Sequence, residues 1–248
     1  AASLAAVWPR PVVAVDLDVE GPNLHLFLHP RDVASRGATV DVPAVDLEAC
    51  TRCGACVALC QFKALSLMGG QLLTFTELCH GCGGCFRVCE AGALRRVTRP
   101  LGEVQWGRTA DGLPWIGGRL RVGEPMAPPL MREVLRDLRL RQGEADALLD
   151  APPGVSCPAM TVAQEADVLV LVTEPTPFGL HDLKLAVQAF RPLGKPMGVV
   201  VNRADIGTPE VVAYCRAQGL PVLLELPFRR DIAEHYARGF VVAELDRG

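Results

Sequence analysis

The sequence predicts an α/β fold built on a parallel sheet, with a small cysteine-rich domain inserted into it. Two observations lead to this expectation. Short apolar runs rich in valine and leucine alternate with amphipathic stretches, which is the pattern of parallel strands covered by helices on both faces. Eight of the ten cysteines fall between Cys50 and Cys89, so a separate unit interrupts that alternation.

The expected elements follow one another along the chain. "AASLAAVW" at the N-terminus has the pattern of a helix, and "VVAVD" at 12–16 that of a buried strand. The stretch 104–124 predicts short antiparallel strands with turns at Asp111-Gly112 and Gly117-Gly118. Helices are expected at 129–142, 161–166, 179–192 and 208–218, and further strands in "DALLDAPPG", "DVLVLVTEP", "MGVVVNRAD" and "PVLLELPF".

Polar side chains end several of the predicted strands. Asp16 and Asp18 follow the first strand, and Asp150, Glu174 and Asn202 each follow a later one. Because the carboxyl ends of parallel strands meet at one edge of a sheet, where α/β proteins bind ligands, we expect these side chains to gather there. Asp16 and Glu174 are equally well explained as helix caps or turn residues. "LLDAPPG" has the pattern of a Walker B strand that leads into a switch loop, with Asp150 placed to hold Mg²⁺ through water.

One cysteine motif occurs twice. "CTRCGACVALCQFKAL" begins at Cys50 and "CHGCGGCFRVCEAGAL" begins at Cys79, so a C-x2-C-x2-C-x3-C unit is repeated with all its cysteines at a constant offset. Three thiolates at this spacing wrap a tight loop around a cubane, and in two-cluster ferredoxins the fourth cysteine ligates the other cluster. The spacing predicts two [4Fe-4S] clusters, one held by Cys50, Cys53, Cys56 and Cys89 and the other by Cys79, Cys82, Cys85 and Cys60.

Disulfides and zinc are the alternative explanations of the cysteines. The N-terminus lacks the basic region and the long apolar stretch of a secretory signal, and four-cysteine zinc sites usually pair two separated C-x2-C units. One departure from bacterial ferredoxins is the absence of proline after the fourth cysteine, where this chain has Gln61 and Glu90; it removes a rigid turn but no ligand. The basic residues Arg95, Arg96 and Arg99 are expected to close the inserted domain, with docking of an acidic redox partner as the alternative.

Composition excludes several classes of protein. A formal net charge of −3 gives no electrostatic reason to bind nucleic acid or an anionic membrane surface. No apolar run approaches the ~18–20 residues of a membrane span. We therefore expect a cytoplasmic protein with no nucleic-acid partner and no membrane span.

A family resemblance covers essentially the whole chain. The order "VDLDVEGPNLHLFL", double cysteine motif, "LLDAPPGVSCP", "VTEPTPFGLHDL", "VVVNRAD" and "LPF" resembles the MinD/ParA-type P-loop ATPases that carry an inserted ferredoxin domain. The resemblance implies a parallel-sheet P-loop NTPase fold of the SIMIBI/MinD-like kind with an inserted α+β bacterial-type ferredoxin domain. It divides the chain into 1–45 and 100–248, the two parts of the ATPase domain, and 46–99, the insert.

The resemblance also implies an ATP site with Mg²⁺. In it, Asp18 orients the attacking water, Asp16 supports the first switch and Asp150 serves the Mg²⁺. Asn202 reads the adenine edge, and Pro227 and Phe228 line the base pocket. Cys157 matches a family position on the switch loop, although a lone cysteine is more often a small apolar residue. Homologous ATPases close as dimers, so a homodimer is expected by analogy.

The phosphate loop that such a site requires is absent from these residues. Family members begin with a strand and a loop of the form GKGGxGKT, and no G-x-x-x-x-G-K-[ST] sequence occurs between Ala1 and Gly248. We expect the first strand and this loop to lie upstream of Ala1, with a natural loss of ATP binding as the alternative.

Three functions remain open. In the first, an ATPase couples nucleotide binding and hydrolysis to electron transfer through two [4Fe-4S] clusters toward a redox partner protein. In the second, the chain is an iron–sulfur scaffold or carrier; the absence of a C-x-x-C pair after Cys89 counts against it. In the third, it is a ferredoxin-like electron carrier without ATPase activity. Transfer of a cluster to an apo-protein would favour the second, and electron transfer unaffected by ATP the third.

Overall fold

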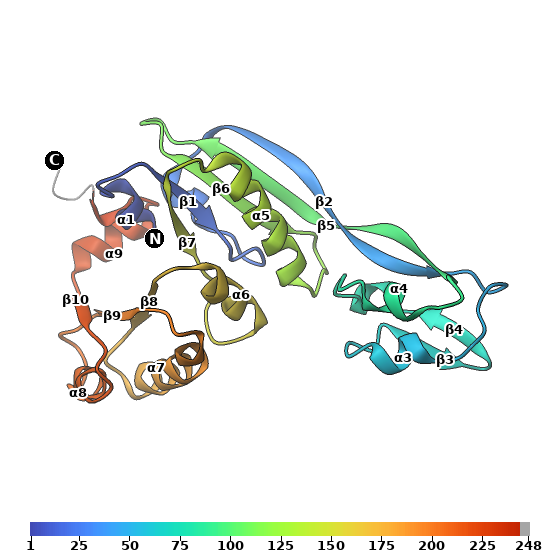
Figure 1. Cartoon of the computed structure of the whole chain (residues 1–248). Coiled ribbons are helices and arrows are strands. Elements are labelled where there is room, and N and C mark those ends of the chain that lie inside the picture. The colour runs from blue at the N-terminus through green and yellow to red at the C-terminus, as the bar shows by residue number, and fades with distance from the viewer. Residues whose placement is uncertain (244–248) are drawn as a thin grey trace.

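The computed structural model describes residues 1–243, which form a body and a lobe that projects from it (Figure 1). The strands form a five-stranded sheet of order β2-β5-β6-β1-β7, a three-stranded sheet of order β10-β9-β8 and the hairpin β3-β4. The strands are β1 (Val12–Asp16), β2 (Arg31–Val45), β3 (Leu65–Met68), β4 (Gln71–Thr74), β5 (Leu94–Arg108), β6 (Pro114–Leu120), β7 (Asp146–Asp150), β8 (Leu169–Thr173), β9 (Met197–Asn202) and β10 (Val222–Leu226).

The helices lie between these strands. They are α1 (Ala2–Ala6), α2 (His25–Leu28), α3 (Ala55–Leu59), α4 (Gly84–Val88), α5 (Ala127–Arg141), α6 (Cys157–Glu165), α7 (Pro177–Phe190), α8 (Glu210–Ala217) and α9 (Arg230–Ala237), with short 3-10 turns η1 (Thr76–Leu78) and η2 (Arg191–Leu193). The four helices expected from periodicity correspond to α5, α6, α7 and α8, so those predictions are confirmed. Within residues 1–243, none of the helices is both long and apolar enough to span a bilayer.

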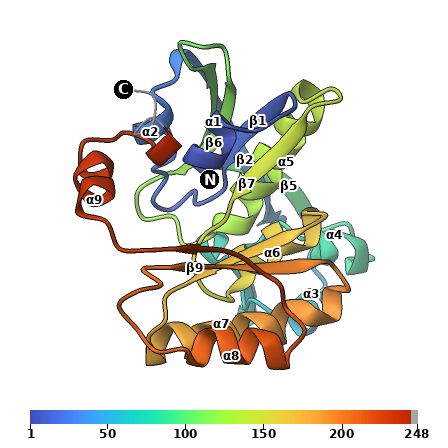
Figure 2. The same ribbon diagram turned by 90° about the vertical axis from the view of Figure 1, so that its left-hand side faces the viewer.

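The parallel strands confirm the predicted α/β fold but fall into two sheets. β1 pairs in parallel with β6 and β7, and β9 pairs in parallel with β8 and β10. Among the described residues no hydrogen-bonded strand joins β7 to β8, so each is an edge of its own sheet. Figure 2 shows α7 and α8 on one face of the β8–β10 sheet, where Leu183, Val187 and Cys215 pack against Val199 and Val201.

A long antiparallel ribbon, β2 with β5, joins the body to the lobe (Figure 1). Its register runs from Arg31 opposite Arg108 to Val45 opposite Leu94. Alternation explains why the middle of β2 is a strand, because Ala38, Val40 and Val42 are buried while the residues between them are exposed. The lobe at the end of the ribbon contains α3, α4 and the β3–β4 hairpin.

The core of the body lies between the five-stranded sheet and α5. Val13 and Val15 of β1 and Leu130, Met131 and Val134 of α5 belong to one buried cluster. The buried residues of α5 recur at helical spacing, so one side of this helix packs against the sheet.

One sequence prediction about the body is wrong. Gly117-Gly118 is not a turn but lies inside β6, whereas the turn near Asp111-Gly112 is confirmed between β5 and β6. The glycines are explained by close packing. A Cβ on Gly118 would lie 2.7 Å from Val19 and 2.8 Å from Val134, and one on Gly117 would lie 2.9 Å from the ring of Trp115. Here glycine permits close approach rather than a turn.

We expect Leu130→Ala to lower the free energy of unfolding by about 2–5 kcal/mol, because it leaves a cavity between α5 and the sheet. Leu140→Ala is the matched control on the same helix: its side chain is 78% exposed, so the change should stay within about 0.5 kcal/mol. Anaerobic urea unfolding followed by circular dichroism measures both. Equal losses in the two variants would contradict the packing described.

Candidate functional site

The eight cysteines of the double motif lie in the lobe, and the two motifs fold alike. α3 and α4 each begin after a glycine of positive φ, Gly54 at 79° and Gly83 at 73°, a conformation that glycine adopts without steric cost. Each helix carries the third cysteine of its motif and ends at the fourth. The residues concerned are Cys56 and Cys60 for α3, and Cys85 and Cys89 for α4.

The structure places the fourth cysteine of each motif beside the other motif. Burial raises the pKa of Cys56, and the neighbouring charges of Cys89 and Cys53 raise it further. Burial likewise raises the pKa of Cys79, which is also repelled by Cys82 and Cys60. These neighbours are those of the crossed sets, Cys50, Cys53, Cys56 and Cys89 in the first and Cys79, Cys82, Cys85 and Cys60 in the second. The crossed ligation remains a prediction that these electrostatic neighbours support.

The chemistry of the donor set fits iron–sulfur clusters. Burial, Cys79 and Cys82 together raise the pKa of Cys85 to about 11, so crowded thiols of this kind need a nearby positive centre to ionise. Within residues 1–243, no group of three or more His, Cys, Asp or Glu side chains surrounds a position for a single metal ion. A four-iron cluster requires no such convergence, because each thiolate binds a different iron.

The basic cluster closes the lobe through ion pairs. Arg95 pairs with Asp46, and Arg96 pairs with Asp41 at 3.3 Å and stacks on Phe86. Arg99 pairs with the buried Glu124. All three cations therefore have partners inside the chain, as expected for residues that close the insert.

Asp16, Asp18 and Asp150 come together at the carboxyl ends of β1 and β7. Asp16 is the last residue of β1 and lies opposite Asp150, the last residue of β7. Its carboxylate is fully buried and accepts hydrogen bonds from the backbone N–H groups of Asp18, Asn23 and Leu24 at 3.2, 3.0 and 2.9 Å. Burial is the main cause that raises the pKa of Asp16 to about 6, and Asp150 adds to it. Burial also raises the pKa of Asp150, with a further contribution from Asp18.

A second group lies at the ends of β8, β9 and β10. Asn202 Nδ2 donates to Glu174 Oε1 at 3.4 Å, and Arg203 lies 3.5 Å from the same carboxylate. Pro227 and Phe228 follow β10 and are exposed, and the backbone N–H of Phe228 donates to Asp205 at 2.6 Å. The expectation that Asp18, Asp150, Glu174 and Asn202 gather along one sheet edge is therefore not met as stated. In residues 1–243 they form two groups on two sheets.

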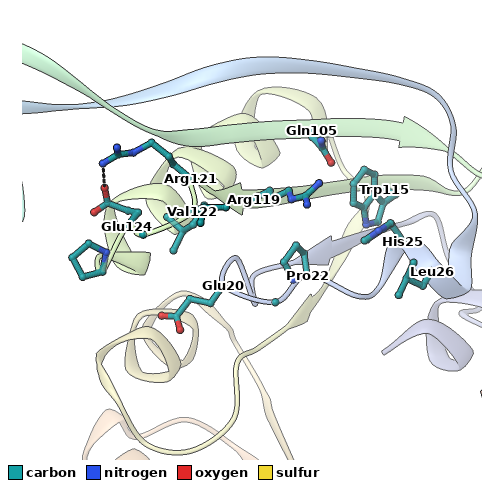
Figure 3. Close-up of a pocket in the computed structure, with 15 residues that line it drawn as sticks. Glu20, Pro22, His25, Leu26, Gln105, Trp115, Arg119, Arg121, Val122 and Glu124 are labelled. Atoms are coloured by element: carbon teal, nitrogen blue, oxygen red, sulfur yellow. Dashed lines mark ion pairs between the residues drawn. The ribbon is translucent and has the colours of Figure 1, made fainter. Parts of the chain in front are cut away.

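A cavity that the sequence did not predict opens near the carboxyl ends of β1 and β6. It has a volume of about 710 Å³, and its lining includes Glu20, His25, Gln105, Trp115 and Arg119 (Figure 3). The segment after Asp18 forms one wall and β6 the other, so residues a hundred positions apart share it. No sequence pattern connects two such segments.

Comparison with known proteins identifies the lobe. A family of 4Fe-4S dicluster domains matches residues 49–94. An uncharacterized protein of Methanocaldococcus jannaschii is 31% identical over 182 residues, which are 73% of this chain and 63% of the relative. The chain thus spans less than two thirds of that relative's length. An iron–sulfur cluster carrier protein of Aquifex aeolicus is 31% identical over 129 residues, 45% of this chain and 35% of the carrier.

Solved structures identify the fold of the body. A ParA family ATPase from Chlorobium tepidum superposes with a TM-score of 0.52 at 14% identity, covering 99% of this chain and 82% of the ATPase. The cell division ATPase MinD of Pyrococcus furiosus gives a TM-score of 0.51 at 18% identity, covering 96% of this chain and 79% of MinD. The chain therefore combines a 4Fe-4S dicluster domain with the P-loop fold of the MinD and ParA ATPases.

Proposed function

We propose that this protein couples the binding and hydrolysis of ATP to electron transfer through two [4Fe-4S] clusters. The observation that carries the proposal is the attachment of the cysteine-rich lobe. The ribbon that holds it ends in the body beside β6, and β6 pairs directly with β1, whose carboxyl end carries Asp16 and Asp18. Only β6 therefore lies between the strand that carries these acids and β5 of the ribbon.

The residues have distinct roles in this proposal. The two crossed cysteine sets hold the clusters, which supply one-electron transfer when bound. Asp18 orients the water that attacks the γ-phosphate, and Asp150 serves the Mg²⁺. Asp16 fixes the segment from Asp18 to Leu24 through its three backbone hydrogen bonds. Asn202 binds the adenine edge, with Pro227 and Phe228 beside the base.

The nucleotide part requires a phosphate loop, which residues 1–248 do not contain. Two free sheet edges offer a place for the strand that leads into one. β7 and β8 have no strand on their outer sides among residues 1–243, so each can pair with a further strand there. Val168, Val170 and Val172 are 58%, 48% and 69% exposed, and because they stand at alternate positions they lie on one face of the sheet beside that edge, which further packing would cover. We propose that the loop-bearing strand lies along one of these edges.

Backbone hydrogen bonds connect the acids to the ribbon. Leu120 N donates to Val19 O at 2.9 Å, and Arg121 N donates to Leu101 O of β5 at 2.8 Å. Two hydrogen bonds, made by the adjacent residues Leu120 and Arg121, therefore connect the segment after Asp18 to β5, the strand that runs from the lobe to the body. A nucleotide can shift the lobe only if it contacts this segment differently in its two states.

Organisation and partners are part of the same proposal. Residues 46–99 would act as the ferredoxin-type insert between the two parts of an ATPase domain, 1–45 and 100–248. A separate redox protein would exchange electrons with the clusters, and the ATPase domain would form a cytoplasmic homodimer.

A cluster carrier is the second candidate function. The similarity to a protein named as an iron–sulfur cluster carrier favours it. The remaining cysteines do not, because Cys157 is exposed while Cys215 is buried in α8, and the two are far apart in the sequence. Anaerobic incubation with an apo-ferredoxin discriminates the two functions: transfer of a cluster would favour the carrier. Electron transfer that is indifferent to ATP would instead favour a plain electron carrier.

The first prediction of this proposal concerns the metal. Anaerobically purified protein should contain about eight irons per chain and show broad visible charge-transfer absorbance. Cys60→Ser should alter the cluster of Cys79, Cys82 and Cys85, and the matched Cys89→Ser should alter the other one. Electron paramagnetic resonance of the reduced variants separates the two. Stoichiometric zinc would contradict the proposal, and the opposite spectral assignment would contradict the crossing.

The second prediction concerns the nucleotide. Residues 1–248 alone should bind ATP weakly or not at all, because the N–H groups and lysine of a phosphate loop provide most of the grip on the phosphates. Isothermal titration calorimetry measures this, and micromolar affinity would show that the site lies elsewhere. In a chain that includes such a loop, Asp18→Ala should slow hydrolysis with ATP binding and iron content intact, whereas Asp150→Ala should also weaken Mg²⁺-dependent binding.

The third prediction concerns Asp16. Its pKa, raised by burial from 3.8 to about 6, means that the folded state holds this proton more tightly than the unfolded state. The contribution of Asp16 to stability is therefore present at low pH and declines as pH rises from about 4 to about 6. Carboxyl ¹³C NMR should show the titration near pH 6, and Asp150→Asn should lower the midpoint. A midpoint near 4 in the wild-type protein would contradict the burial described.

A further inference from the structure

Arg99 is a buried cation at the junction of the ribbon and the lobe. It lies on β5 and is only 7% exposed. Its guanidinium pairs with Glu124, whose side chain is fully buried, and with Glu77 of η1 at 3.2 Å. Arg121 joins the same carboxylates, at 3.2 Å from Glu77 and 3.5 Å from Glu124 (Figure 3 shows the latter). The group links the body to the turn that precedes Cys79.

The second cysteine set lies close to this group and to the body. Cys79 packs against the main core of the body, and Arg99 is the cation that acts on it electrostatically. The following loop lies against the ribbon, because a Cβ on Gly81 would be 2.3 Å from the side chain of Val40. Arg132 of α5 donates to the carbonyl of His80 at 3.4 Å. The second set is therefore the one in contact with the body.

The guanidinium also has an unused donor. Arg99 Nε is buried and has no hydrogen-bond partner in the part of the chain that the structure describes. A buried N–H group without a partner is unfavourable, so such a group normally faces an acceptor. Thiolate and sulfide sulfurs of a cluster are acceptors of this kind, and hydrogen bonds to them are one of the factors that set cluster potentials.

The first cysteine set has the opposite electrostatic neighbour. Hydrogen bonds from the backbone of Ala55 and the side chain of Thr51 lower the pKa of the exposed Cys53. The charged side chain that acts on it is Glu90, which is itself exposed and has a smaller effect in the opposite direction. Water and salt screen an exposed charge strongly, whereas a buried charge acts through a medium of lower dielectric constant. The two sets thus differ: a buried cation lies beside the second and a screened anion beside the first.

We propose that Arg99 raises the reduction potential of the second cluster above that of the first, so that electrons pass from the outer cluster to the one beside the body. This inference rests on the proposed function, since it requires both clusters. The reason is electrostatic: reduction adds one negative charge to a cluster, and a fixed positive charge nearby stabilises the reduced form. Glu124 and Glu77 moderate the effect by partly neutralising Arg99.

Two substitutions that break the same ion pair test the proposal, because they should act in opposite directions. Arg99→Gln should lower the potential of the second cluster by about 59 mV, a tenfold change in the ratio of reduced to oxidised cluster for a one-electron couple. Glu124→Gln leaves Arg99 uncompensated and should raise it. Arg99→Lys keeps the charge and should stay near the wild-type value. The double variant Arg99→Gln/Glu124→Gln removes the cation together with the carboxylate that moderates it, so its potential should lie between that of Arg99→Gln and that of the wild type.

Redox titration followed by electron paramagnetic resonance measures both potentials in each anaerobically purified variant. Cys82→Ser alters the second cluster and so identifies its signal. Arg96→Gln is the control, since Arg96 is an exposed cation on the same strand and its loss should leave both potentials unchanged. Where Arg99→Gln loses its iron, Glu124→Gln and the double variant still give the sign of the effect.

The outcomes separate this inference from the function on which it rests. Wild-type protein without two clusters would overturn the proposed function and this inference together. Two clusters whose potentials do not respond to Arg99→Gln or Glu124→Gln would overturn only the role of Arg99. Shifts in the same direction for both variants would do the same, because they would indicate a general loosening of the lobe.

Discussion

The antiparallel pairing of β2 with β5 is the interaction on which the rest of the structure depends. The pairing extends from Arg31 opposite Arg108 to Val45 opposite Leu94, with register shifts between Arg31 and Ala34 and between Ala38 and Thr39, and it fixes how the lobe and the body face each other. Beyond the last pair, Asp46 N still donates to Ala93 O at 2.8 Å, so the lobe begins on a hydrogen-bonded base. Because β5 also pairs with β6, the same strand belongs to the body sheet at one end and to the lobe at the other.

Helix α5 fixes this ribbon from one side. Arg36 of β2 donates to the buried Asp137 at 2.7 Å and pairs with Glu133 at 3.0 Å, while Arg132 of the same helix contacts the loop of the second cysteine set. Taking these charges out of water is costly unless each is paired, and breaking such a pair costs more than the pair contributes. The paired charges therefore specify one position of the ribbon on α5. These pairs and the Arg99–Glu124 pair together hold the second cysteine set against the body.

Sequence reasoning succeeded where the pattern is local. The cysteine spacing, the four helices α5 to α8 and the acids that end β1 and β7 all depend on residues within a few positions of each other. Features that depend on contacts between distant segments could not be predicted in this way. Gly117-Gly118 has the composition of a turn, but Gly118 lies in a strand against which Val19 and Val134 pack closely. The sequence does not predict the strand at 31–45, because much of this segment is polar and its partner lies beyond the whole insert. The pairing of Arg99 with Glu124 follows from no periodicity, since the tertiary fold alone brings them together.

The central claim is that the lobe holds two clusters by crossed ligands, with the second one beside the body. Anomalous diffraction at the iron edge from anaerobically grown crystals tests it most directly. The account predicts two iron positions, one among Cys50, Cys53, Cys56 and Cys89, and the other among Cys79, Cys82, Cys85 and Cys60 and nearer to Arg99. A single iron position, or two positions each surrounded by the four cysteines of one motif, would contradict it.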